Sequence, residues 1–417
     1  MRNFAGILLA LLAGMASATY GQEWPRFRGP NGTGVSTAAG IPVAWQEQDY
    51  LWKTRLPGEG HSSPVVWDDR IFTTCADPVT GDRKLLAVDA PSGEILWEED
   101  FGGEVYPVHH LNTFASGSPA VDAERVYIAF ATPERLFLAA LSQEGEEVWT
   151  QDLGPYASQH GFGSSPIVYK DMVILANDQL EVEGLQNQSF LVALDAATGE
   201  LRWKSPRASV TAAYSTPFVI TASDGAPQLV FSSQAEGLVG VDPASGAKLW
   251  GLAVWDKRAV SSPFAAAGLV FGACGSGGGG NYIAAVAPPS PSSSLPPQVA
   301  YEMRNSAPYV PTGVAVDGRV YLVSDKGVAT CIRAADGSQV WRTRLSNGEY
   351  YASPIVVQDR VYAISTEGVV TVFAAEDEYR LLGESTLGEE CRSTPAVSGG
   401  RLILRTRTQL MAVGSGS

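Results

Sequence analysis

The chain has few cysteines, and none stands where a cofactor or a structural metal would need it. Only four occur in 417 residues, at Cys75, Cys274, Cys331 and Cys391. No two are adjacent and no Cys-x-x-Cys pair exists, so the sequence signatures of haem attachment and structural zinc are missing. We expect scattered buried thiols. A disulfide stays open for an oxidising compartment, but the spacing selects no pair.

Clustered positive charge is also missing. Lys and Arg number 29 against 44 Asp and Glu, which gives a formal net charge of −15. Because binding to a phosphate backbone needs grouped Lys and Arg, we expect no nucleic-acid partner. There is no Gly-x-Ser-x-Gly elbow, no His-Glu-x-x-His pair and no dinucleotide fingerprint. The glycine run at 275–280 lacks the Lys-Ser/Thr of a P-loop and leads into a strand, so we interpret it as a loop.

Long hydrophobic runs are absent beyond the first residues. Residues 4–16 are almost wholly apolar, and small residues at 16–18 fit a cleavage site. This pattern predicts a signal peptide over 1–18, a mature chain from Thr19 and export to the periplasm or the extracellular space. The alternative, a membrane anchor, needs a longer run, and no cysteine follows for lipid attachment. No later segment is long enough to span a membrane, and we expect a monomer.

What the chain has in abundance is a repeat. Residues 193–203, Ala-Leu-Asp-Ala-Ala-Thr-Gly-Glu-Leu-Arg-Trp, read as a strand, a tight turn and a second strand that carries a tryptophan. Close copies lie at 87–97, 240–250 and 332–341, with a looser one at 140–149. Repetition at a near-fixed period indicates a repeat architecture, and we expect the tryptophan to pack between neighbouring units.

A second mark counts the units. Ser/Thr-Pro stands at the head of a short apolar strand seven times, and Pro311-Thr312 fills an eighth place. Pro is tolerated there because the first residue of a strand does not need its N–H for the ladder. The eight prolines lie at 64, 119, 166, 217, 263, 311, 354 and 395. Each unit contains four short strands, A to D, separated by turn residues such as Asp-Gly and Ser-Gly.

Four antiparallel strands per unit, with a period in the forties, predict an all-β chain folded as an eight-bladed β-propeller. The last unit has only three strands of its own. Residues 50–56, YLWKTRL, match the D strand QVWRTRL at 339–345 almost residue for residue. We therefore expect the N-terminal strand to close the last blade, which removes an unpaired edge.

These assignments divide the chain into the signal peptide, an N-terminal arm at 19–40 and the propeller at 41–417. The Pro and Gly content of 24–36 argues against a regular element in the arm. Trp24 and Phe27 are expected to hold the arm against the propeller.

The motif Ala-x-Asp-x-x-Thr-Gly-x-x-x-Trp, nearly intact at 193–203, is typical of PQQ-like propeller repeats. The chain resembles a secreted bacterial PQQ-like repeat protein from about residue 40 to its end, and its arm is similar to the start of such proteins. Two kinds of relative carry these repeats. The BamB-type assembly factor is an eight-bladed scaffold without catalytic activity, whereas quinoprotein dehydrogenases bind pyrroloquinoline quinone (PQQ) and Ca²⁺ over the propeller axis.

The resemblance makes PQQ a candidate cofactor, but the adjacent cysteine pair usual in the dehydrogenases is missing here. The lipoprotein cysteine of the BamB-type factor is missing too. The resemblance therefore implies the fold more strongly than it implies an activity.

The loops that lead from strand D to the next strand A are expected to open together on one face, around the central channel. All four histidines lie in three successive loops of this kind. Polar and aromatic groups that converge at one mouth are typical of a binding site on a rigid scaffold. The candidate ligand-binding residues at this mouth are Glu59, His61, His109, His110, Asn112, His160, Tyr214, Arg258, Tyr309, Glu349, Tyr350, Glu389 and Arg392.

Three interpretations of this mouth stay open: a hydrated channel end, a site for a protein segment, small molecule or glycan, and a metal or quinone site. His61, His109 and His160 are the candidate metal ligands, although their spacing matches no local metal motif. The carboxylates of a quinone would need an arginine nearby, and the mouth offers Arg258, Arg304 and Arg392. We expect an exported, non-catalytic binding or assembly scaffold that acts through its D–A loop face. A quinone- or metal-dependent oxidoreductase with a site at the propeller axis is the alternative.

Overall fold

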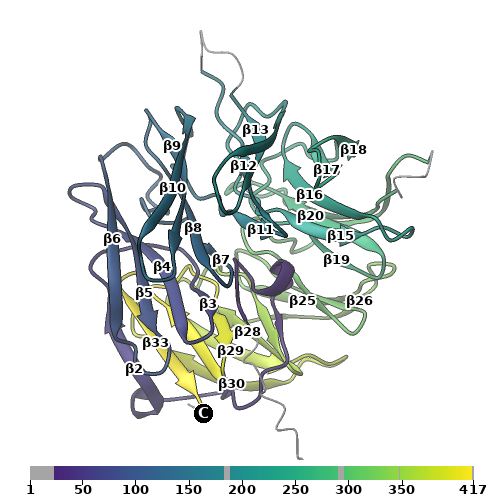
Figure 1. Ribbon diagram of the computed structural model, residues 1–417. Helices are drawn as coiled ribbons and strands as arrows, with labels where there is room; N and C mark the ends of the chain where they lie inside the picture. The colour runs from purple at the N-terminus through teal and green to yellow at the C-terminus, as the bar shows by residue number, and fades with distance from the viewer. Residues whose placement is uncertain (1–22, 183–187, 290–294, 347, 416–417) are drawn as a thin grey trace, which may run out of the picture.

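The computed structural model describes residues 23–182, 188–289, 295–346 and 348–415, and its strands form eight sheets around one axis (Figure 1). Seven sheets have four strands and one has five. The predicted eight-bladed propeller is therefore confirmed. The expected signal peptide and the first residues of the arm lie outside the described residues. None of the helices in the described ranges has the length and apolar character that a membrane span requires.

Blades 1 to 4 each contain four consecutive antiparallel strands. Blade 1 consists of β3 (Val65–Trp67), β4 (Arg70–Ala76), β5 (Asp82–Asp89) and β6 (Ile95–Gly103). Blade 2 consists of β7 (Ala120–Val121), β8 (Arg125–Ala131), β9 (Leu136–Ser142) and β10 (Glu147–Gly154). Blade 3 consists of β11 (Ile167–Tyr169), β12 (Met172–Asn177), β13 (Phe190–Asp195) and β14 (Leu201–Pro206). Blade 4 consists of β15 (Phe218–Thr221), β16 (Pro227–Ser233), β17 (Gly237–Val241) and β18 (Lys248–Leu252).

Blades 5 to 7 continue in the same way. Blade 5 consists of β19 (Phe264–Ala266), β20 (Leu269–Cys274), β21 (Tyr282–Ala287) and β22 (Gln298–Met303). Blade 6 consists of β23 (Val314–Val316), β24 (Arg319–Val323), β25 (Val328–Arg333) and β26 (Gln339–Arg344). Blade 7 consists of β27 (Ile355–Val357), β28 (Arg360–Ile364), β29 (Val369–Ala374) and β30 (Leu381–Thr386).

Blade 8 is built from both ends of the chain. Its own strands are β31 (Ala396–Ser398), β32 (Arg401–Arg405) and β33 (Gln409–Gly414). The fourth strand is β2 (Tyr50–Arg55), which follows the 3₁₀ turn η2 (Glu47–Asp49). It pairs antiparallel with β33, with Trp52 opposite Ala412. The predicted closure by the N-terminal strand is confirmed.

A ring of buried hydroxyl groups explains why Ser or Thr stands at the head of each first strand. The backbone N–H of seven of the eight ring residues donates to the side-chain hydroxyl of the next blade, over 2.8–3.0 Å. One of them, from Thr394 to Ser63, joins the last blade to the first. We call this set the hydroxyl ring; it consists of Ser63, Ser118, Ser165, Thr216, Ser262, Thr312, Ser353 and Thr394.

The tryptophan of strand D docks onto the following blade, as the repeat predicts. Trp149 of blade 2 packs against Gly199 in the turn of blade 3. Its Nε1–H donates to the carbonyl of Ala196, 3.0 Å away. Equivalent bonds of 2.7–3.0 Å run from Trp52 to Ala90, Trp97 to Gln143, Trp203 to Pro243, Tyr301 to Ala334 and Trp341 to Glu376.

Blade 4 reaches blade 5 through an intermediate residue, because the usual turn of blade 5 is replaced by a longer connection. Trp250 donates to the Gln228 side chain over 2.6 Å. The amide nitrogen of Gln228 donates in turn to the Pro289 carbonyl over 3.1 Å. The amide side chain thus keeps the inter-blade link where the repeat departs from its motif.

Adding a methyl group at Gly199 is expected to destabilise the protein by about 2–4 kcal/mol, because left-handed strain and overpacking add together. Gly199 has φ +72°, and a Cβ atom there would lie 2.6 Å from the Trp149 ring. Gly225→Ala is the matched control, since Gly225 has φ +85° and no neighbour within 4 Å of a Cβ. Chemical unfolding of the two variants measures the difference. Equal losses would contradict a tight Trp149 contact.

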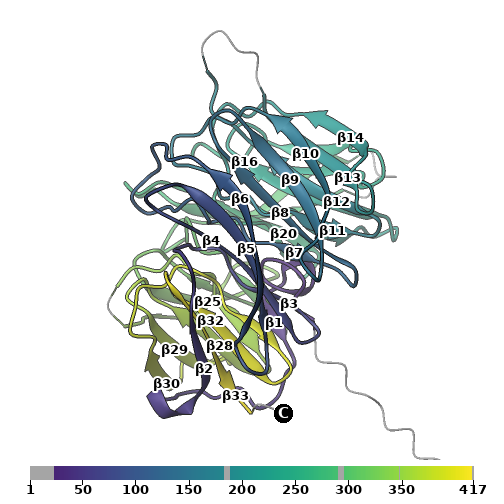
Figure 2. The ribbon, with the colours of Figure 1, turned by 60° about the vertical axis from the view of Figure 1, so that its left-hand side comes forward.

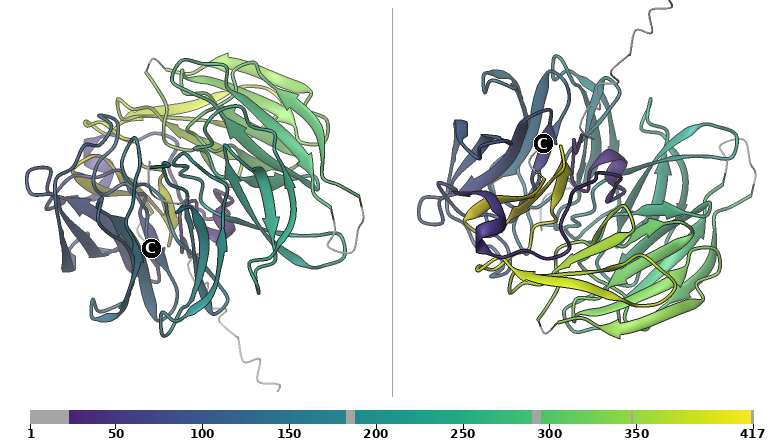
Figure 3. Two further views of the ribbon diagram at one scale, coloured as in Figure 1. Left: turned by 90° about the horizontal axis from the view of Figure 1, so that it is seen from above. Right: turned by 90° about the horizontal axis from the view of Figure 1, so that it is seen from below.

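The N-terminal arm crosses the middle of the propeller on the side away from the D–A loops (Figure 3, right). The prediction of no regular element in it is wrong in two short places. Residues Pro30–Gly32 form the 3₁₀ turn η1, and β1 (Val35–Ser36) pairs parallel with β27 as a fifth strand of blade 7 (Figure 2). The pairing of β1 and the bonds between Asn31 of η1 and Val219 are long-range contacts, which local composition does not reveal.

Two buried side chains hold the arm in place. Trp24 is fully buried and its backbone forms a bridge with Val66 of β3. Arg28 is fully buried as well and donates to the carbonyls of Thr312, Gly313 and Pro354 over 2.7–3.2 Å. The arm therefore contacts blades that are far apart in the ring.

Candidate functional site

Two layers of side chains line the central channel. The lower layer is the hydroxyl ring. The upper layer contains the residue two positions before each ring member, because residues i and i+2 of an extended chain face the same side. It consists of His61, Ser116, Gly163, Tyr214, Val260, Val310, Tyr351 and Arg392. These two layers and Phe27 of the arm enclose about 140 Å³, a space that we call the neck.

Beyond the upper layer the channel widens into a cavity of about 1060 Å³ between the D–A loops. All eight residues of the upper layer line both the cavity and the neck, so the two spaces adjoin. Phe27 of the arm also lines the neck, and the arm bonds to first strands beyond the hydroxyl ring, as in the bond from Val121 to Pro25 over 2.8 Å. The channel is therefore blind: it opens at the D–A face and ends at the arm. Its volume suits a small-molecule site.

Nine of the thirteen candidate residues line this cavity. They are His61, His109, Asn112, His160, Tyr214, Arg258, Tyr309, Glu349 and Arg392. The sequence therefore assigns the correct loops to the cavity.

The other four candidates do not line the cavity. The predicted place of Tyr350 at the channel mouth is corrected by the structure. Tyr350 is fully buried in the core beneath its loop and bonds to Ser346 over 2.9 Å. Neighbouring residues of an extended chain point to opposite faces, so Tyr351 and not Tyr350 faces the axis. Glu389 accepts hydrogen bonds from Thr408 at 2.8 and 3.2 Å and so fixes the turn between β32 and β33.

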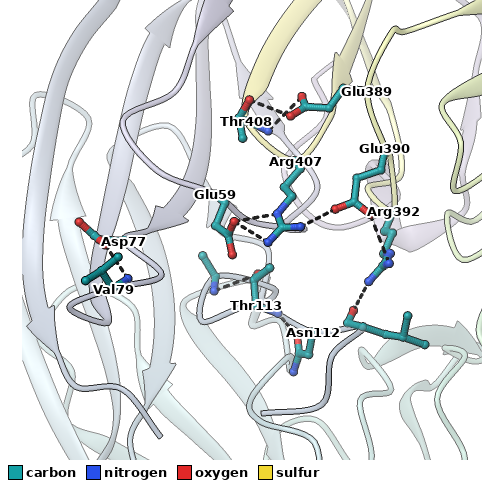
Figure 4. A network of polar contacts seen from close by, with 12 residues as sticks. Glu59, Asp77, Val79, Asn112, Thr113, Glu389, Glu390, Arg392, Arg407 and Thr408 are labelled. Atoms are coloured by element: carbon teal, nitrogen blue, oxygen red, sulfur yellow. Dashed lines mark hydrogen bonds and ion pairs between the residues drawn. The ribbon is translucent and has the colours of Figure 1, made fainter. Parts of the chain in front are cut away.

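The remaining two candidates, Glu59 and His110, also lie outside the cavity. Glu59 accepts from Arg407 over 2.7 Å, and Arg407 also contacts Glu390 over 2.8 Å (Figure 4). Glu390 in turn reaches Arg392 over 3.3 Å, so a chain of ion pairs joins the loops before blades 8 and 1. His110 lies exposed outside the cavity, with its ring 4.3 Å from that of His109.

Burial lowers the pKa of the three imidazoles that line the cavity. Desolvation, followed by the guanidiniums of Arg392, Arg405 and Arg407, lowers the pKa of His61 to about 3. Desolvation also lowers the pKa of His109 and of His160, whose rings lie 4.7 Å apart. The Nδ1 atoms of His61 and His160 are buried and have no hydrogen-bond partner among the described atoms. A neutral His61 imidazole with an unused polar atom therefore faces the channel.

Arg258 is the cavity's cation without an acidic partner among the described residues. Its guanidinium donates to the side-chain oxygen of Gln159, and its buried Nε has no partner in the described part of the chain. The other cations of the outer cavity are paired: Lys257 with Asp256 at 3.3 Å, Arg304 with Glu302 at 2.8 Å, and Lys326 with Glu349.

The family follows from the sequence. A profile of the family described as outer membrane protein assembly factor BamB matches residues 34–108, 81–307 and 280–413. The chain belongs to this family. Within this BamB family, the solved structure of BamB from Moraxella catarrhalis is 14% identical, has a TM-score of 0.60 and is aligned over 87% of this chain and 96% of that chain.

Relatives with other names share the fold or part of the chain. Quinohemoprotein alcohol dehydrogenase from Comamonas testosteroni is 12% identical, with a TM-score of 0.64, over 95% of this chain and 81% of that chain. Identities this low establish the fold alone. Polyvinylalcohol dehydrogenase from Sphingopyxis sp. (strain 113P3) is 25% identical over 162 residues, which are 37% of this chain and 23% of that protein. The BamB-family chain thus matches less than a quarter of the length of this relative.

The residues of the channel do not fit a metal-dependent quinone site. Among the described residues, no three of His, Cys, Asp and Glu come together as metal ligands would, so His61, His109 and His160 form no such group. The four cysteines are buried free thiols, which confirms the expectation and leaves no disulfide beside the cavity. Arginines that could hold a quinone carboxylate are present, but the carboxylates that Ca²⁺ prefers are not gathered there.

Several lining residues of this BamB-family propeller were missed as candidates. Asp325 is the main one; it accepts from the backbone N–H groups of Tyr309 and Val310 over 2.7 and 3.1 Å. The glycine loop at 275–280 also lines the cavity, although its sequence predicts only a loop without a binding role. Counting two residues back from each Ser/Thr-Pro would have identified the entire upper layer, including Tyr351.

Acid is expected to weaken the fold partly through His61. Its folded pKa of about 3 lies below the ordinary 6.5, so between these pH values the unfolded chain binds more protons and stability falls as pH falls. At pH 5 the loss from this group is on the order of 2 kcal/mol. His61→Gln should therefore lose less stability than the wild type between pH 7.5 and pH 5 in urea unfolding. An unchanged pH slope would contradict this.

Proposed function

We propose that the protein is an exported, non-catalytic binding scaffold that takes its ligand end-on into the blind channel of the D–A face. The observation that carries this proposal is the upper layer. Eight equivalent positions surround the axis, yet they hold seven side chains of mixed chemistry and one glycine, whereas the hydroxyl ring below them is uniform. A uniform ring serves the fold, and a mixed layer over a closed end is what recognition of one ligand would use.

Filling the channel tests the proposal. Gly163 belongs to the upper layer, and a Cβ there would meet the Tyr214 ring at 3.2 Å with no strained φ. Gly163→Phe should therefore block the channel, and Gly163→Ala adds one methyl group as the matched control. Native mass spectrometry of protein purified from an exporting host should reveal a bound molecule in the wild type and in Gly163→Ala, but not in Gly163→Phe. A bound mass that survives Gly163→Phe would contradict binding in the channel.

A second experiment distinguishes the scaffold from the oxidoreductase alternative. We expect no dye-linked oxidation of alcohols after the protein is mixed with PQQ and Ca²⁺, because the described residues offer no metal-ligand group. Turnover that disappears in Gly163→Phe would overturn the non-catalytic part of the proposal and place the alternative first.

A further inference from the structure

The upper layer has a polar side and an apolar side. His61, Arg392 and Tyr351 come from blades 1, 8 and 7, which are neighbours in the ring. Val260 and Val310 come from blades 5 and 6, on another part of the circumference. A molecule in the neck therefore meets charge and hydrogen-bond donors on one flank and aliphatic groups on another.

The floor below this layer is rich in donors. Seven hydroxyl oxygens of the ring accept a backbone N–H, so one lone pair of each is already used. None of the eight hydroxyls donates a hydrogen bond to a described protein atom. Since a hydroxyl carries one donor, these hydrogens are available to an acceptor in the neck. A group with several acceptor atoms fits this floor best.

Arg392 adds charge at the same place. One of its terminal nitrogens donates to the Leu111 carbonyl over 2.7 Å, and the other lies 3.3 Å from Glu390 (Figure 4). Its Nε is buried and has no partner among the described atoms. Glu390 also pairs with Arg407, at the shorter distance of 2.8 Å. The ion pair between Glu390 and Arg392 is therefore the weaker of the two.

A second guanidinium reinforces the positive field. Arg405 is fully buried behind the ring and donates to the Ser62 carbonyl over 2.8 Å. No ion pair engages it among the described residues, in contrast to Arg407. The lowered pKa of His61, to about 3, is consistent with the positive field of these arginines in addition to burial.

We propose that the neck binds the anionic head of an organic ligand, a carboxylate on an apolar or aromatic body. The carboxylate would lie between Arg392, His61 and the hydroxyl ring, and the body would rest against Val260 and Val310. The inference rests on the proposed function, since it names the ligand class of the same channel. The neck volume of about 140 Å³ leaves room for a ring-sized fragment, and the cavity above takes the rest.

The test uses 4-fluorobenzoate and its neutral analogue 4-fluorobenzamide, with ¹⁹F NMR titration of the full chain. The two probes have nearly the same shape and differ in charge. We expect the benzoate to bind at least about tenfold more tightly than the benzamide, because a charge-assisted contact is lost in the neutral amide. Arg392→Gln should remove that preference, and Arg342→Gln, on the exposed face of β26, should keep it.

Two further variants keep the test decisive if Arg392→Gln folds poorly. Glu390→Gln removes the carboxylate that competes for Arg392, so the benzoate should bind more tightly there. Gly163→Phe should remove both probes. Equal binding of benzoate and benzamide, with both lost in Gly163→Phe, would overturn this inference and leave the proposed function standing. Benzoate binding that survives Gly163→Phe would contradict both.

A competition experiment with phosphate tests whether the apolar body of the ligand contributes to binding. Inorganic phosphate at equal ionic strength should not displace 4-fluorobenzoate, because it has no body to place against the two valines. Displacement of the probe by phosphate at a similar concentration would overturn the proposal in favour of a free-ion site. Crystals soaked in 4-bromobenzoate should place the anomalous bromine signal above the upper layer and the carboxylate below it. The reverse orientation would also contradict the proposal.

Discussion

Trp24→Ala is expected to cost about 3–5 kcal/mol of the free energy of unfolding, because it removes a large buried ring and leaves a cavity. Trp24 is fully buried, and its ring lies against the backbone of Gly29, where a Cβ would come within 2.5–2.8 Å of it. Urea unfolding followed by fluorescence measures the loss. Because the arm reaches several blades, its release should also expose β1 to rapid amide exchange.

Trp24→Phe is the matched control for that result. The Nε1–H of Trp24 is buried and has no hydrogen-bond partner among the described atoms, so phenylalanine sacrifices no hydrogen bond. It should recover most of the stability that Ala loses. Phe27→Ala should show the opposite pattern. Phe27 is only partly buried, so the free energy of unfolding should fall less, while the channel loses its closed end. Equal losses in Trp24→Phe and Trp24→Ala would contradict packing as the cause.

The number of blades and the closure of the ring could be predicted because each depends on a local pattern. The eight prolines count the first strands, and residues 50–56 repeat a D strand that blade 8 lacks. The hydroxyl ring could not be derived in this way. Its hydrogen bonds join neighbouring blades, so the reason for Ser or Thr before Pro appears only when Ser63 and Thr394 meet. The path of the arm depends equally on long-range contacts, such as those of Arg28.

The cavity was predicted at the level of loops and not at the level of single side chains. Loop assignment alone placed His61, Arg258 and Arg392 correctly at the cavity. It failed where the parity of an extended chain decides the direction, as with Tyr350, which is buried beside a cavity-facing neighbour. It also failed for Glu389, because a threonine-lined turn from another strand binds that carboxylate first. Such competition between loops leaves no trace in the sequence.

Trp52→Ala is expected to cost about 3–5 kcal/mol, like other losses of a large buried aromatic side chain, but it should act on ring closure as well. Trp52 lies on β2, yet its Nε1–H donates to the Ala90 carbonyl of blade 1 over 2.9 Å. Trp149 makes the same kind of contact between blades 2 and 3, which are consecutive in the chain. Trp149→Ala is therefore the matched control, with a similar loss of contact away from the seam.

Amide hydrogen exchange should distinguish the two variants. Blades 8 and 1 are joined by β2, by Trp52 and by the bond from Thr394 to Ser63, so weakening the tryptophan contact lets the N-terminal strand open while the remaining blades stay paired. We expect β2 and β33 to lose protection in Trp52→Ala and to keep it in Trp149→Ala, because local opening follows the weakest interface. Uniform loss of protection over all blades in both variants would mean that the ring opens as one cooperative unit. In that case the seam would be no weaker than any other blade interface, and the closing strand would add only its ladder of hydrogen bonds.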